Sequence, residues 1–172
     1  AGDEGEVLRD EDMLAEDLAL ITRYFAGEFK PVKRTAPGVG WATKDGRKWE
    51  EVSTVDGFEP IYKAGFKVAA IAQDLGNGTW NWTIGRLPLF PFPVGPGHRD
   101  RNADPRSWRE DTLLGFLGIA EDQRNPNQDP AASWGGGDTI GGGPRGKTDA
   151  GQTGSMFSPA QVGELIRDFN GL

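Results

Sequence analysis

A proline-rich run near the middle of the chain sets the strongest limit on how it can fold. Residues 87–97 read Leu-Pro-Leu-Phe-Pro-Phe-Pro-Val-Gly-Pro-Gly, with four prolines among the nine residues 88–96. Proline lacks a backbone N–H and fixes φ, so this run is excluded from a helix and from a central strand. We expect a polyproline II-like connection, either packed on the body through its apolar residues or exposed as a docking ligand.

The segments before this connection predict antiparallel strands. Residues 39–54 form one hairpin with Asp45-Gly46 at its turn. Residues 67–73 and 80–86 form a second hairpin around a turn that contains Gly76, Asn77 and Gly78.

The last of these strands ends on a charged residue. Trp80, Trp82 and Ile84 alternate and so share one face, which we interpret as core packing rather than a stacking platform for nucleobases. Arg86 follows at the end of the strand, where it can contact a ligand or form a surface salt bridge.

Three segments predict helices. The first covers residues 10–26 with Leu14, Leu18, Ile21 and Phe25 on one face. The second covers 107–119, after Asp104-Pro105, and is followed by a polar loop over 121–132. The third begins with a capping box at Ser158 and Gln161 and runs to about Phe169.

Together these elements predict an α+β fold. We expect an antiparallel or mixed sheet built from hairpins, with an N-terminal helix and a C-terminal helix. Residues 1–29 form an acidic N-terminal helix, and residues 30–172 form a single α+β domain with a glycine-rich loop at 135–154.

Composition excludes several classes of site. The 172 residues contain no cysteine and one histidine, His98, so disulfides, thiolate sites and His/Cys zinc sites are excluded. No catalytic triad or paired carboxylate stands out, and we assign no catalytic or metal-binding residue and no cofactor. The formal net charge of −7 falls within residues 1–29, and the sequence has no contiguous basic stripe of the kind that double-stranded nucleic acid requires. Without an apolar run of membrane-spanning length or a signal-like N-terminus, we expect a cytoplasmic protein.

The segment 134–147 is the most unusual part of the sequence. Two glycine triplets, 135–137 and 141–143, flank Asp138, Thr139 and Ile140. Glycines let successive backbone amides face one concavity, which suits a phosphate. The candidate ligand-binding residues are Gly141, Gly142, Gly143, Arg145, Lys147, Asp138, Thr139 and Arg86. A flexible surface tether is the competing interpretation.

A family resemblance follows from this segment. The run Gly141-Gly142-Gly143-Pro144-Arg145, followed by Gly154-Ser155 and a capped C-terminal helix, resembles the DHH-associated domain of DHH-type phosphoesterases over about residues 60–172. In that family this element helps to hold the phosphate or nucleotide of the substrate. Pro144 stands where the family commonly has histidine, and the family's metal-binding Asp and His motifs are missing from the sequence. The resemblance therefore implies a substrate-binding half rather than a catalytic one.

Three functions remain as hypotheses. The first is a domain that binds a phosphate-containing small molecule or a single-stranded nucleic acid end, as a homo-oligomer or beside an upstream catalytic domain. The second is a structural or interaction protein that docks through its acidic helix and its proline-rich run. The third is a small hydrolase with a carboxylate-bound metal.

Overall fold

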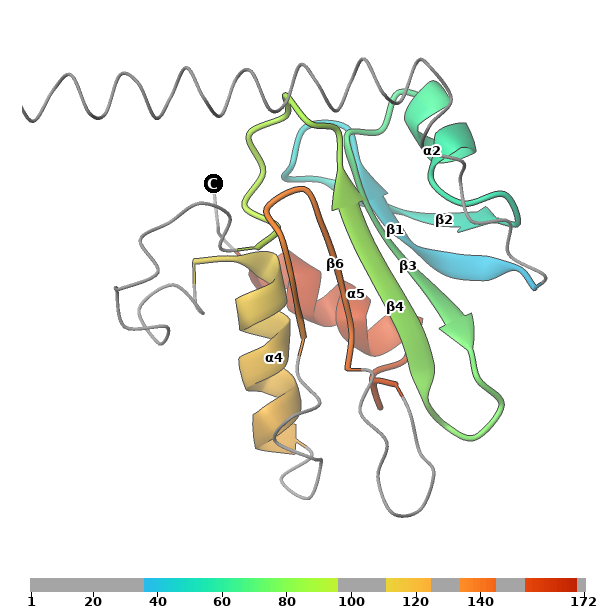
Figure 1. Ribbon diagram of the computed structural model, residues 1–172, viewed down its shortest axis with the longest axis vertical. Coiled ribbons are helices and arrows are strands. Elements are labelled where there is room, and N and C mark those ends of the chain that lie inside the picture. The colour runs from blue at the N-terminus through green and yellow to red at the C-terminus, as the bar shows by residue number, and fades with distance from the viewer. Residues whose placement is uncertain (1–35, 96–110, 125–133, 145–153, 170–172) are drawn as a thin grey trace, which may run out of the picture.

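The computed structural model describes residues 36–95, 111–124, 134–144 and 154–169. They form an α+β fold with a six-stranded antiparallel sheet in the order β2-β1-β3-β4-β6-β5 (Figure 1). The elements are β1 (Gly38–Thr43), β2 (Trp49–Thr54), α2 (Glu59–Lys63), β3 (Val68–Asp74), β4 (Trp80–Arg86), α4 (Leu113–Arg124), β5 (Gly135–Gly136), β6 (Ile140–Gly142) and α5 (Pro159–Asp168).

Both predicted hairpins are confirmed. In β1–β2, Gly38 pairs with Thr54, and Gly46 takes a positive φ of 81° at the turn. In β3–β4, Val68 pairs with Arg86. Glycine adopts positive φ without steric cost, so the glycines of these turns set where each chain reversal occurs.

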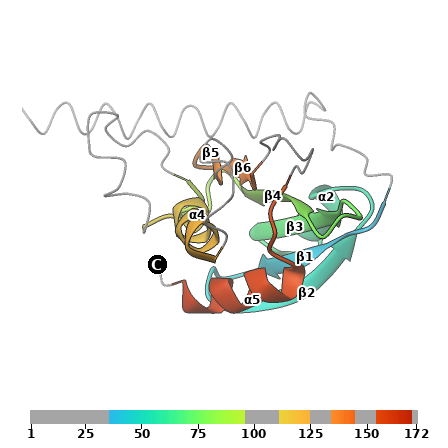
Figure 2. The ribbon, with the colours of Figure 1, turned by 90° about the horizontal axis from the view of Figure 1, so that it is seen from below.

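The two faces of the sheet are covered differently. Alternate residues of β3 and β4, among them Ala70, Trp82 and Ile84, point into the main core beneath α4 and α5. The remaining residues, among them Ile71, point towards α2 and pack with its Ile61. Figure 2 shows α4 and α5 on one side of the sheet and α2 on the other. Trp82 is completely buried, so its predicted role in the core is confirmed.

The proline-rich connection packs on the body, as the first of its two interpretations predicts. Phe92 and Val94 are buried in the main core, at 3% and 0% exposure. The carbonyl of Val94 accepts a hydrogen bond of 2.9 Å from the amide of Leu114 at the start of α4. Leu89 remains 53% exposed, so the connection packs on the body mainly through Phe92 and Val94.

The C-terminal helix α5 agrees with the sequence prediction, whereas the helix α4 differs from it. The capping box is confirmed, since the Ser158 amide donates to Gln161 Oε1 over 2.9 Å and the Gln161 amide donates to Ser158 Oγ over 3.4 Å. The predicted bounds of the second helix are wrong, because residues 111 and 112 are not helical and α4 runs from Leu113 to Arg124 instead of ending at about Ile119. Within the extension, Glu121, which was expected in a polar loop, is buried.

The N-terminal helix expected over residues 10–26 lies outside the described residues. None of the helices in the described ranges is long and apolar enough to span a bilayer.

Candidate functional site

The glycine-rich segment forms a hairpin rather than a loop over its first half. β5 and β6 pair with each other, and β6 also pairs with β4, with Ile84 opposite Gly141. The amide of Gly143 donates to the carbonyl of Trp82 over 3.2 Å. The backbone groups of β6 therefore face neighbouring strands on both sides.

Close packing accounts for the glycine at position 141. A Cβ atom there would lie 2.4 Å from Leu114 Cδ1 and 2.7 Å from the carbonyl oxygen of Gly135. Both distances are far below van der Waals contact, so a side chain would push the hairpin away from α4. Nothing lies within 4 Å of a Cβ built at Gly135, on the facing strand.

Arg86 holds the turn of this hairpin. Its Nε donates to the carbonyl of Asp138 over 2.9 Å, and its Nη2 lies 3.3 Å from the Asp138 carboxylate. Its Nη1 donates to the carbonyls of Leu87 and Pro88, and its backbone amide donates to Thr139. The predicted salt bridge is present, but the Arg86 side chain is only 9% exposed. Its guanidinium therefore joins the glycine hairpin to the proline-rich connection rather than facing solvent.

The structure separates the predicted ligand-binding residues into two groups. Arg86, Asp138 and Thr139 meet at one end of β6, and Gly143 lies at the other end. The three residues of β6 span about 10 Å at the usual rise of a strand. Arg145 and Lys147 lie outside the described residues.

The residues on either side of segment 145–153 are bonded to neighbouring positions of β4. It leaves after Gly143, whose amide is bonded to Trp82. It returns at Ser155, which exchanges two hydrogen bonds with Trp80, of 2.7 and 2.8 Å. Both ends of the intervening segment are therefore fixed to one strand, two residues apart.

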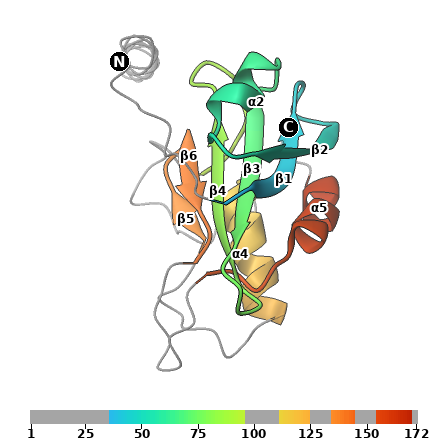
Figure 3. The same cartoon turned by 90° about the vertical axis from the view of Figure 1, so that its right-hand side faces the viewer.

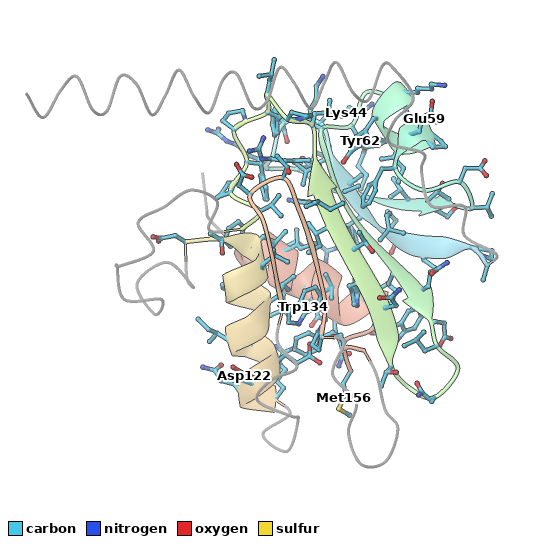
Figure 4. All side chains as sticks on the ribbon, in the orientation of Figure 1. Lys44, Glu59, Tyr62, Asp122, Trp134 and Met156 are labelled. Carbon is cyan, nitrogen blue, oxygen red and sulfur yellow. The ribbon has the colours of Figure 1, made fainter. Side chains whose placement is uncertain are left out.

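A buried carboxylate, absent from the candidates chosen by sequence, fixes the return point. Glu121 of α4 is 1% exposed and accepts three hydrogen bonds. The donors are Trp134 Nε1 at 2.5 Å, Ser155 Oγ at 2.6 Å and the Met156 amide at 2.7 Å. All three partners donate, and the two carboxylate oxygens accept. We call Glu121, Trp134, Ser155 and Met156 the Glu121 clamp; Figure 4 labels Trp134 and Met156 towards the lower end of the hairpin.

Aromatic residues enclose the clamp. The rings of Trp82 and Trp134 lie 6.1 Å apart, and Trp82 Nε1 donates to the Phe157 carbonyl over 2.9 Å. A Cβ at Gly143 would lie 3.2 Å from Trp82 Cβ, so this turn too packs tightly. The low dielectric of such surroundings strengthens the hydrogen bonds to Glu121.

Within the described ranges, no group of three or more His, Cys, Asp or Glu side chains could hold a metal ion. No protein-family model, curated protein or solved structure matches the chain.

Proposed function

We propose that this chain is a binding domain for a phosphorylated or nucleotide-like ligand, resembling the substrate-binding half of a DHH-type phosphoesterase. The observation that carries the proposal is the double attachment of segment 145–153 to β4. This segment begins with Arg145 and contains Lys147 two positions later. Arginine matches phosphate oxygens with a planar pair of donors, and lysine adds a compact positive charge.

The Glu121 clamp supports the same proposal. A segment whose two ends are already held in place loses less conformational freedom when it closes on a ligand. A flexible tether would not need a buried carboxyl group with three donors at its base, because burying a polar group is costly unless its hydrogen bonds are satisfied. The clamp is therefore better explained by a segment that must present its residues in a defined place.

The glycines and the charged residues have different roles in this proposed site. Gly141 lets the hairpin approach Leu114 of α4, Gly143 lets the chain approach Trp82 of β4, and the contact with phosphate falls to Arg145 and Lys147. Arg86, Asp138 and Thr139 fix the opposite turn.

Because the sequence lacks the Asp and His motifs of the family's metal-binding half, we propose that this chain binds the ligand rather than hydrolyses it. A cytoplasmic setting is part of the proposal, because phosphorylated metabolites and nucleotides are abundant there.

The test is a titration of the full chain with inorganic phosphate, nucleoside monophosphates and short oligonucleotides. We expect saturable binding of at least one probe, and a loss of about tenfold or more in Arg145→Ala, as for hydrogen bonds to a charged group. Lys147→Ala should weaken binding less. Arg167→Ala is the matched control. Arg167 belongs to α5 and lies over the ring of Trp41 in β1, away from the clamp. Absence of saturable binding, or equal affinity in wild type and Arg145→Ala, would overturn the proposal.

A further inference from the structure

Positive charge is concentrated at one end of the sheet, where β1 and β4 finish and β3 begins. Six of the eight lysine and arginine residues within the described ranges belong to this end, although the whole chain carries a net charge of −7. We call these six the basic end: Lys44, Arg47, Lys48, Lys63, Lys67 and Arg86. Figure 4 labels Lys44 at the upper end of the molecule, far from Met156.

The β1–β2 turn holds three of these cations on a fixed backbone. Asp45 Oδ1 accepts from the amides of Arg47 and Lys48 over 2.8 and 2.9 Å, and from Thr43 Oγ1 over 3.1 Å. The amide of Gly46 donates to the same Thr43 hydroxyl over 2.9 Å. Hydrogen bonds thus hold the backbone of the turn, while residues 44, 47 and 48 are exposed.

Four of the six cations have no carboxylate partner in the described part of the chain. Lys63 pairs with Glu59 at 3.0 Å and Arg86 pairs with Asp138, whereas residues 44, 47, 48 and 67 form no salt bridge there. Oδ1 of Asp45 accepts hydrogen bonds from its own turn. The basic end therefore has unneutralised positive charge that an acidic partner can satisfy.

Apolar surface accompanies this charge. The Lys44 ammonium lies 5.0 Å from the centre of the half-buried Phe66 ring. On the same face, Ile140 pairs with Gly85 and remains 55% exposed. The basic end thus combines cations with exposed apolar atoms, which suits a partner that is both acidic and apolar.

The chain itself contains a segment of that chemistry. Residues 1–29 have nine acidic and two basic residues, a net charge of −7, and include Leu14, Leu18, Ile21 and Phe25 at helical spacing. We propose that the basic end is the docking surface for residues 1–29 of the same chain. This inference is independent of the proposed ligand, because the Glu121 clamp lies at the opposite end of β4.

The geometry of the connection permits this docking. The first described residue, Ala36, precedes β1, whose last residue, Thr43, reaches the basic end. Six residues of β1 span about 20 Å, and residues 30–35 can span a similar distance when extended. The acidic segment can therefore return along the sheet to the cations.

Carbodiimide cross-linking of the full chain tests the proposal, because this reagent joins lysines to carboxylates that are in contact. We expect cross-links at low salt from Lys44, Lys48 or Lys67 to acidic residues between 3 and 28, with a loss at 1 M salt, where charges are screened within about 3 Å. The triple variant Lys44→Glu/Arg47→Glu/Lys48→Glu reverses several surface ion pairs. The yield of cross-links at the remaining Lys67 should therefore fall on the order of tenfold. The double variant Arg124→Glu/Arg167→Glu, altered away from the basic end, should keep the wild-type yield.

A mixture of isotope-labelled and unlabelled chains identifies the occupant. Cross-links confined to one isotope mean that the segment docks on its own chain, as proposed. Cross-links between labelled and unlabelled chains would assign the surface to a second copy and overturn the proposal. It would equally be overturned if residues 1–29 formed no cross-link to these lysines, or if the charge-reversed and control variants gave the same yield.

Discussion

The indole Nε1 of Trp134 donates a hydrogen bond of 2.5 Å to the carboxylate of Glu121, and both side chains are at most 6% exposed. This bond joins the end of α4 to the start of the glycine hairpin. The same carboxylate also binds Ser155 and Met156, just before α5. One buried acidic residue therefore connects three segments that are separate in the sequence.

Replacing Glu121 with alanine should lower the free energy of unfolding by about 3 kcal/mol or more. The change leaves the Trp134, Ser155 and Met156 donors without an acceptor, and each buried unsatisfied group costs about 1–3 kcal/mol. Urea denaturation measures the difference. The control Glu164→Ala changes an exposed acid on α5 and should stay within about 0.5 kcal/mol. Equal effects of the two changes would show that the clamp adds no stability.

Two glycines of the hairpin should differ in their tolerance of a methyl group. Gly141→Ala should cost about 1–3 kcal/mol, because its Cβ would overlap Leu114 and the Gly135 carbonyl. Gly135→Ala has open space around the new Cβ and should be nearly neutral. Thermal unfolding of both variants makes the comparison, and a neutral Gly141→Ala would mean that the hairpin does not pack on α4 as described.

The Arg86 contacts should depend on the shape of the side chain as well as its charge. Arg86→Lys keeps the charge but cannot donate together to the carbonyls of Asp138, Leu87 and Pro88, so we expect a loss of about 1.5–3 kcal/mol. Asp138→Asn removes only the ion pair and should cost less, because its backbone carbonyl still accepts from Nε. Chemical denaturation that ranked the two variants in the opposite order would contradict this account.

Asp45 should titrate below its ordinary range. The amides of Lys48 and Arg47 hold the pKa of Asp45 down by hydrogen bonding to its ionised form. Because the pKa is lower in the folded state, its contribution to stability is present above the unfolded value of about 3.9 and is lost as the pH falls through the folded value. An NMR titration of the Asp45 carboxyl carbon should give a midpoint below that of an unstructured aspartate. A midpoint at the unstructured value would show that the turn is not formed in solution.

The sequence predicts those elements whose signal is local. Asp45-Gly46 marks one hairpin turn, and Ser158 with Gln161 marks the start of α5, because each pattern acts within four residues. The strands β5 and β6 give no such signal, since glycine has no side chain to alternate. Their pairing depends on β4 and Leu114, which are distant in the sequence.

The clamp could not be predicted for a related reason. Glu121 lies in a run of polar residues, and an acidic residue is ordinarily exposed. Its burial depends on donors at positions 134, 155 and 156, which only the folded chain brings together. Trp134 and Ser155 carry no pattern in the sequence that connects them with α4.

The position of the glycine hairpin also affects how the molecule behaves among its own copies. Without β5 and β6, the seven-residue strand β4, with Trp82 and Ile84, would end the sheet on that side. An apolar strand with an unpaired edge is a template for aggregation, whereas an edge of two glycines is too short to recruit another chain. At the opposite edge, β2 presents Glu50 and Glu51 to solvent. Figure 3 shows β5 and β6 bordering β4 along this edge. A change that detaches the hairpin should therefore be seen first as loss of protein from solution during expression.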